Sequence, residues 1–93
     1  MEKKISVLIV EDSALVRQLL VDIISHDDEL EVAGIARDGV EAIRLTQELH
    51  PDVITMDIHM PEMDGLSALE YIMKKSPRPV VMLSAFVKKG AVP

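Results

Sequence analysis

The 93-residue chain contains no cysteine, and only two of its residues, Tyr71 and Phe86, are aromatic. The absence of cysteine excludes disulfide bonds and thiolate metal sites. With so few aromatic residues, a hydrophobic core must be built from aliphatic side chains. The length of the chain is sufficient for one small domain with a single core.

Long apolar runs are also lacking. The first apolar segment, residues 5–10, is too short for a signal peptide or a membrane span, so a cytoplasmic protein without a membrane partner is expected. The formal net charge of −6 argues against a general affinity for nucleic acid or anionic membranes. The basic residues are scattered, and their pairs are expected to be solvated.

The pattern of apolar residues predicts four strands and three helices. The strands are expected at residues 5–10, 31–36, 52–57 and 79–83. Helical spacing follows each of the first three, over residues 14 to about 26, 39–49, and from a cap at Asp64 to before Pro77. The order predicts a doubly wound parallel sheet with helices on both faces, in the α/β class.

Acidic residues follow two of these strands. Glu11 and Asp12 close the first strand and Asp57 closes the third, while Ser84 follows the fourth. Because parallel strands end at one edge of a sheet, these groups would converge if the strands are neighbours. Clustered carboxylates raise one another's pKa values, so the cluster implies a cation, and hard oxygen ligands suit Mg²⁺. The plainer alternative is that each acid is a helix cap or a solvated turn residue, as is expected for Asp64.

Three segments carry a resemblance to a known family. They are residues 11–13 (Glu-Asp-Ser), 57–65 (Asp-Ile-His-Met-Pro-Glu-Met-Asp-Gly) and 80–85 (Val-Val-Met-Leu-Ser-Ala). The chain resembles the receiver domains of two-component response regulators over nearly its whole length. The resemblance implies a flavodoxin-like sheet with strand order 2-1-3-4, and with the family's fifth strand missing.

The resemblance also implies roles for individual residues. Asp57 would be the phosphoacceptor that takes a phosphoryl group from a histidine kinase. Glu11, Asp12 and Asp57 would hold Mg²⁺ together with the backbone carbonyl of His59. Ser84 would be the switch hydroxyl that moves toward the phosphoryl oxygens.

A finer similarity concerns the receivers of chemotaxis protein-glutamate methylesterases, carried by residues 12–17, 31–39 and 79–82. It implies a chemotaxis-type kinase and an effector domain in a longer parent chain. No esterase constellation occurs in these 93 residues, so the sequence leaves open whether the protein is an enzyme. A receiver of a DNA-binding regulator, or a stand-alone receiver, is the alternative within the family.

Residues 1–93 are expected to form a receiver that lacks the family's helix four, strand five and helix five. The fourth strand would then be an exposed apolar edge, which favours a fragment of a longer protein or self-association through that strand.

Two other functional classes fit the sequence less well. A Mg²⁺-dependent phosphatase with an aspartate nucleophile usually has a second acid two residues later, where His59 stands. A nucleotide-binding domain would have a glycine-rich loop after the first strand. Among the remaining polar residues, Arg17 is expected to be solvated on the outer face of its helix. His26 and His50 are expected at helix ends, where a partly charged imidazole suits the helix dipole.

Overall fold

The computed structural model describes residues 3–58 and 65–83 of the chain. The elements are, in order, β1 (Ile5–Val10), α1 (Ala14–Ser25), β2 (Leu30–Ala36), α2 (Gly39–Leu49), β3 (Val53–Asp57), α3 (Gly65–Lys75) and β4 (Val80–Leu83). Each of them was predicted, with ends that differ by a residue or two where the predicted end lies within the described residues. The prediction for α3 included a cap at Asp64, which lies outside these residues.

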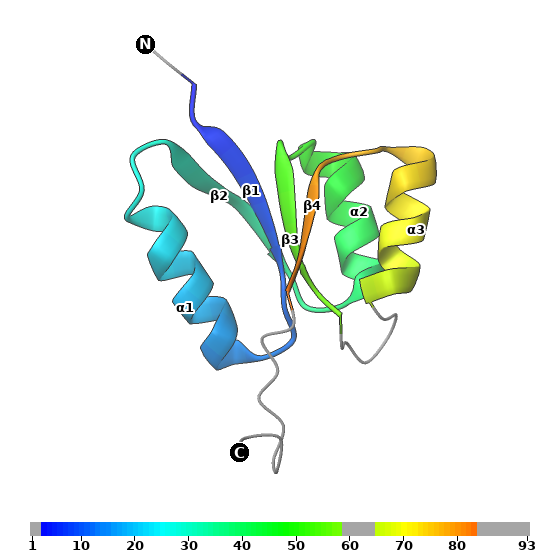
Figure 1. Ribbon diagram of the computed structural model, residues 1–93, viewed down its shortest axis with the longest axis horizontal. Helices are drawn as coiled ribbons and strands as arrows, with labels where there is room; N and C mark the ends of the chain where they lie inside the picture. Colours follow the sequence, from blue (N-terminus) through cyan, green and yellow to red (C-terminus); the bar gives the residue numbers. More distant parts are fainter. Residues whose placement is uncertain (1–2, 59–64, 84–93) are drawn as a thin grey trace.

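The strands form one parallel sheet in the order β2-β1-β3-β4, as the sequence predicted (Figure 1). The two central strands, β1 and β3, therefore lie side by side although α1, β2 and α2 separate them in the sequence. Helix α1 covers one face of the sheet, and α2 and α3 cover the other. The fold is the doubly wound, flavodoxin-like arrangement, in which ligands bind at the ends of the strands.

Each face of the sheet has its own buried cluster. The cluster between the sheet and the α2/α3 layer is formed by Leu8, Val10, Ala36, Ala42, Ile54, Met56, Ala68 and Ile72. The cluster beneath α1 is smaller, with Val7, Ile9 and Ile24 at its centre. Alternate residues of β1 thus enter different clusters, because successive side chains of a strand point to opposite faces. Both faces of β1 are buried over residues 7–10, which explains the continuous apolar run there.

Gly34 lies where the pairing of β1 with β2 shifts register, between Val7 and Leu8. A Cβ atom at this position would lie 2.7 Å from a methyl carbon of Leu49 at the end of α2. The glycine therefore admits the Leu49 side chain against the sheet. A glycine inside a strand weakens it, and β2 is accordingly an edge strand of the sheet.

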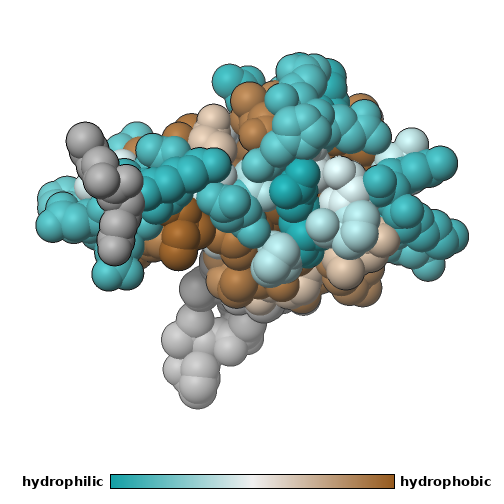
Figure 2. Space-filling model, turned by 90° about the horizontal axis from the view of Figure 1, so that it is seen from above, coloured by the Kyte–Doolittle hydropathy of each residue, from teal (hydrophilic) through white to brown (hydrophobic). Residues whose placement is uncertain are grey.

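Helix α1 exposes an apolar stripe made of Leu15, Leu19 and Ile23, which are 72%, 53% and 66% exposed. The helical spacing of the apolar residues does not by itself indicate which side of α1 meets the sheet. Positions four apart do share one side of a helix, but the sheet contacts the adjacent side, centred on Ile24. Figure 2 shows hydrophobic residues gathered along the lower flank of its view, beside a hydrophilic middle.

Strand β4 leaves Val81 50% exposed. Its backbone pairs with Thr55 of β3, whose hydroxyl oxygen is buried and has no hydrogen-bond partner in the described part of the chain. Apolar surface is therefore exposed along the outer strand β4 as well as along the apolar stripe of α1. None of the described helices is both long enough and apolar enough to cross a membrane.

Candidate functional site

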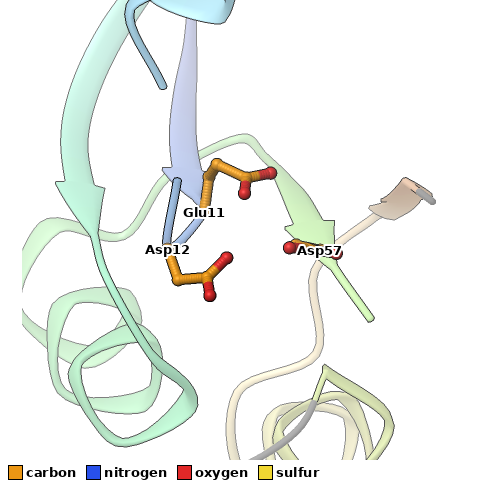
Figure 3. A group of neighbouring side chains, drawn as sticks. All are labelled: Glu11, Asp12 and Asp57. Atoms are coloured by element: carbon orange, nitrogen blue, oxygen red, sulfur yellow. The ribbon is translucent and has the colours of Figure 1, made fainter. Parts of the chain in front are cut away.

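Two adjacent strands bring three carboxylates together at the edge of the sheet. Glu11 and Asp12 follow the last residue of β1, and Asp57 is the last residue of β3. One oxygen from each of the three groups lies within 4.8 Å of the others. Figure 3 shows these side chains around a common space beside the strand ends. The predicted convergence of these three residues is therefore confirmed.

Glu11 is the most enclosed member of the cluster, with 2% of its surface exposed. One carboxylate oxygen, Oε2, accepts a hydrogen bond of 3.1 Å from the backbone N–H of Ser13. The other, Oε1, is buried and has no hydrogen-bond donor among residues 3–58 and 65–83. Burial raises the pKa of Glu11 to about 7, and the nearby Asp57 and Asp12 add to the rise, while the Ser13 N–H opposes it.

Asp57 is also buried, with 5% of its surface exposed, whereas Asp12 is exposed to solvent. The site is therefore deep on the side of β1 and β3 and open at Asp12. A ligand from solution can reach the cluster through that open side.

Gly65, the first residue of α3, lies directly against the end of β3. A Cβ atom there would overlap the backbone carbonyl of Asp57, and the Gly65 N–H donates a 2.9 Å hydrogen bond to the carbonyl of Ile58. Only glycine allows the helix to begin this close to Asp57. This close approach explains why the sequence motif has a glycine at position 65.

The donor set fits a hard divalent cation. A buried carboxylate oxygen without a partner is unfavourable, because the charged group loses hydration and gains no compensating bond. Three carboxylates facing one another repel, and a cation between them would relieve both effects. Oxygen ligands alone, from Glu11, Asp12 and Asp57, suit Mg²⁺ better than zinc or copper.

The structure places Arg17 differently from the sequence expectation. Its guanidinium Nη1 donates to the carbonyl of Glu11 at 3.2 Å and to the carbonyl of Asp12 at 3.1 Å. Arg17 is half-buried, so the prediction of a solvated arginine on the outer face of α1 is wrong. Position along the helix gave no signal for this contact, because the long side chain reaches back past the start of the helix.

Ser13 is a second residue whose role sequence reasoning missed. It caps α1, with its hydroxyl accepting a 3.3 Å hydrogen bond from the Val16 N–H. A serine immediately before a helical period is a signal for such a cap. Asp38 caps α2, with its carboxylate accepting a hydrogen bond from the Glu41 N–H, and the Glu41 carboxylate accepts one from the Arg37 N–H.

Two predicted site residues, His59 and Ser84, lie outside the described residues. Strand β4 ends at Leu83, which pairs with Asp57, so the described part of β4 reaches the level of the site. The metal-ligating carbonyl and the switch hydroxyl remain predictions.

The opposite edge of the sheet, where β3 begins, holds another carboxylate: Asp52, one residue before β3. Its Oδ2 accepts from the backbone N–H of Ser6 at 2.8 Å and from the hydroxyl of Ser6 at 3.1 Å. These hydrogen bonds hold the pKa of Asp52 below its usual value. This carboxylate is exposed, and the protein supplies two donors to its Oδ2.

His50 ends α2 at the same edge, in a left-handed conformation with φ of 49°. Its Nδ1 lies 3.1 Å from Nη2 of Arg78. Because a guanidinium nitrogen can only donate, Nδ1 is the acceptor in this hydrogen bond. The expected position of His50 at a helix end is confirmed, since it is the C-cap of α2.

The comparisons with known proteins agree with the geometry. Residues 7–92 match the family described as the response regulator receiver domain. The chain belongs to this family. The receiver is the phosphoacceptor switch of two-component signalling.

Relatives of known structure or name support the assignment. The chain is similar to the response regulator domain of Thermotoga maritima CheB, at 49% identity and a TM-score of 0.87, covering 97% of this chain and 67% of that one. It also resembles a chain of the CheX–CheY–BeF3–Mg²⁺ complex from Borrelia burgdorferi, at 34% identity and a TM-score of 0.80, covering 90% of this chain and 64% of that one.

Among curated proteins, the chain is 56% identical to the protein-glutamate methylesterase/protein-glutamine glutaminase of Pyrococcus horikoshii over 91 residues. The match covers 98% of this chain and 25% of that protein. The chain spans about a quarter of the length of the curated relatives that it matches.

Proposed function

We propose that Asp57 is the phosphoacceptor of this receiver and that Glu11 and Asp12 complete a Mg²⁺ site beside it. The observation that carries the proposal is the convergence of the three carboxylates around the buried, unpartnered Oε1 of Glu11. The carbonyl of His59 and the hydroxyl of Ser84 are proposed as a further metal ligand and the switch hydroxyl. These two assignments are supported by the family motif.

The reaction assigned to Asp57 is an in-line displacement at phosphorus. A carboxylate oxygen of Asp57 forms the new bond to the phosphorus atom. The bond from phosphorus to the imidazole nitrogen of a phosphorylated histidine kinase breaks, and its electron pair stays with that nitrogen. Burial of Asp57 at a fixed strand end holds the nucleophile in position before the donor arrives.

When bound, Mg²⁺ supplies positive charge that offsets the charge spread over the transferring phosphoryl oxygens. Glu11 and Asp12 would hold it, with Asp12 on the open side of the site. The start of α3 packs against the backbone of Asp57 and thereby fixes the end of the strand that carries the carboxylate.

The test uses acetyl phosphate as a small phosphodonor. In the presence of Mg²⁺ we expect an acid-stable, base-labile adduct, detected as a mass increase of the intact protein. Asp57→Asn should abolish the adduct, because the amide is not a nucleophile of this kind. Asp52→Asn, at the other edge of the sheet, is the matched control and should leave it unchanged. An adduct that persists in Asp57→Asn would contradict the assignment.

We further propose that the parent protein is a chemotaxis methylesterase regulated by this receiver, with a histidine kinase as the phosphodonor. The support is the identity of 49–57% to receivers and methylesterases of that type. Reconstitution with a chemotaxis histidine kinase tests the partner: transfer from the kinase to Asp57 should be much faster than transfer from kinases of other systems.

We also propose that residues 1–93 are part of a longer receiver, whose remaining strand and helix pack on β4 and the apolar stripe of α1. The support is the exposure of Leu15, Leu19 and Ile23 beside an uncovered strand edge. Such surfaces favour association when they are left open.

The 93-residue chain by itself should accordingly self-associate in sedimentation experiments. A Val81→Lys and Leu19→Lys double variant should weaken that association by placing charge on the uncovered surface. A wild-type chain that is monomeric and melts cooperatively at high concentration would contradict the proposal.

A further inference from the structure

The strand-to-helix turn that carries Glu11 and Asp12 is held from several directions. The Glu11 N–H donates to the carbonyl of Ala36 on β2, at 3.0 Å. The Ser13 N–H donates to the Glu11 carboxylate. These bonds fix the first and last peptide N–H groups of the turn.

Arg17 fixes the carbonyl groups of the same turn. Its Nη1 bridges the carbonyls of Glu11 and Asp12, so one side chain holds two successive peptide planes. Rotation of either plane would redirect the carboxylate attached next to it. The contact matters most for Asp12, whose side chain is exposed and therefore less confined by packing.

The charge of Arg17 acts in the opposite direction from this positioning. A guanidinium close to the acidic cluster repels a divalent cation, so charge alone predicts weaker binding of Mg²⁺ in its presence. If Arg17 instead positions the ligands, its removal should weaken binding. The sign of the change therefore distinguishes the two effects.

We propose that Arg17 is a positioning residue of the metal site, which holds the Glu11–Asp12 backbone so that both carboxylates are preorganised for a divalent cation. The inference rests on the proposed Mg²⁺ site. It assigns to α1 a direct part in forming that site. Partners of metal ligands act in this way in other metal sites, where their loss lowers affinity by about 10- to 100-fold.

The first test is calorimetric titration of Mg²⁺ into the wild type and into Arg17→Met, which keeps the length of the side chain without its donors. We expect Arg17→Met to bind about 10-fold more weakly. Arg17→Lys keeps the charge but ends one bond short of the position of Nη1, which makes both hydrogen bonds, and should also bind more weakly than the wild type. Lys74→Met, at the far end of α3, removes the same charge from an exposed position and should change little.

Tighter or equal binding by Arg17→Met would overturn the inference, as would binding by Arg17→Lys that equals the wild type. If the wild type itself binds no Mg²⁺, the proposed function fails, and a second readout still tests Arg17. That readout is amide hydrogen exchange at Ser13 in EDTA, which should be faster in the Arg17 variants.

The exchange of Ile54, whose N–H bonds to the carbonyl of Pro79 in the centre of the fold, serves as the internal control. It should stay unchanged in a folded variant. Unchanged exchange at Ser13 in a folded Arg17→Met would overturn the inference. If that variant does not fold, Arg17→Lys carries both measurements.

Discussion

The two edges of the sheet hold carboxylates in opposite circumstances. At the edge where β3 begins, Asp52 accepts hydrogen bonds from both the N–H and the hydroxyl of Ser6, and its pKa is lowered. At the edge where β1 and β3 end, Glu11 is buried with one unpartnered oxygen, and its pKa is raised to about 7. The two edges therefore differ in where the compensation for negative charge comes from.

At the Asp52 edge, the protein itself supplies the donors. At the Glu11 edge, the described residues supply more carboxylate instead, and the positive Arg17 side chain contacts backbone carbonyls. An acid at a strand end is thus structural when the fold satisfies it. It indicates a binding site when the fold buries it among other acids and leaves an oxygen open.

The largest expected difference between the edges is in Mg²⁺ affinity. Asp57→Asn and Asp12→Asn should each weaken binding by about 10-fold or more, because each removes a charged ligand. Asp52→Asn removes the same charge from the other edge and should leave the affinity nearly unchanged. Calorimetric titration at one ionic strength measures all three. Equal losses in the three variants would mean that only net charge matters.

The next difference concerns stability against pH in the absence of metal. The pKa of Glu11 is about 7 in the fold against an ordinary value of 4.5, so the folded state binds the proton more tightly than the unfolded state. The contribution of Glu11 is therefore favourable below pH 4.5 and is lost as the pH rises to 7. The loss should be roughly 1–3 kcal/mol.

Glu11→Gln keeps the acceptor for Ser13 and removes the titration. In EDTA, its free energy of unfolding relative to the wild type should rise from pH 5 to pH 8, measured by urea denaturation. Saturating Mg²⁺ should remove most of this advantage, because the cation then compensates the wild-type carboxylate. A difference in the free energy of unfolding that does not vary with pH would show that the charge of Glu11 does not destabilise the fold.

The smallest effect is expected at the satisfied edge. The lowered pKa of Asp52 means that its contribution to stability is present above pH 3.8 and is lost as the pH falls through the folded value. Asp52→Asn should lower the melting temperature slightly at pH 7, since the carboxylate is exposed, and the difference should vanish toward pH 2. A variant that melts higher than the wild type at pH 7 would contradict this account.

Much of this arrangement could be predicted from the sequence, because the local patterns agree with one another. The alternation of β-branched runs with helical spacing predicts the element order, and parallel strands then bring Asp12 and Asp57 to one edge. Their convergence with Glu11 also requires β1 and β3 to be neighbours, which the resemblance to receiver domains implied. Periodicity and turn residues are properties of the chain alone.

Other features depend on where side chains go after the helices have packed. The apolar positions of α1 look alike in sequence, yet only one side of the helix meets the sheet, and Leu15, Leu19 and Ile23 remain outside. Arg17 could not be predicted because its contact depends on the path of a flexible side chain to two carbonyls. The hydrogen bond of His50 depends on Arg78, which is distant in sequence.

The close approach of Gly65 to the Asp57 carbonyl has a mechanical consequence. The first turn of α3 has no free space between itself and the end of β3, and a hydrogen bond to Ile58 joins the two. A displacement of the strand end is therefore transmitted into the helix and is not absorbed by a compressible gap. Chemistry at Asp57 can in this way be felt along the 11 residues of α3, as far as Lys75.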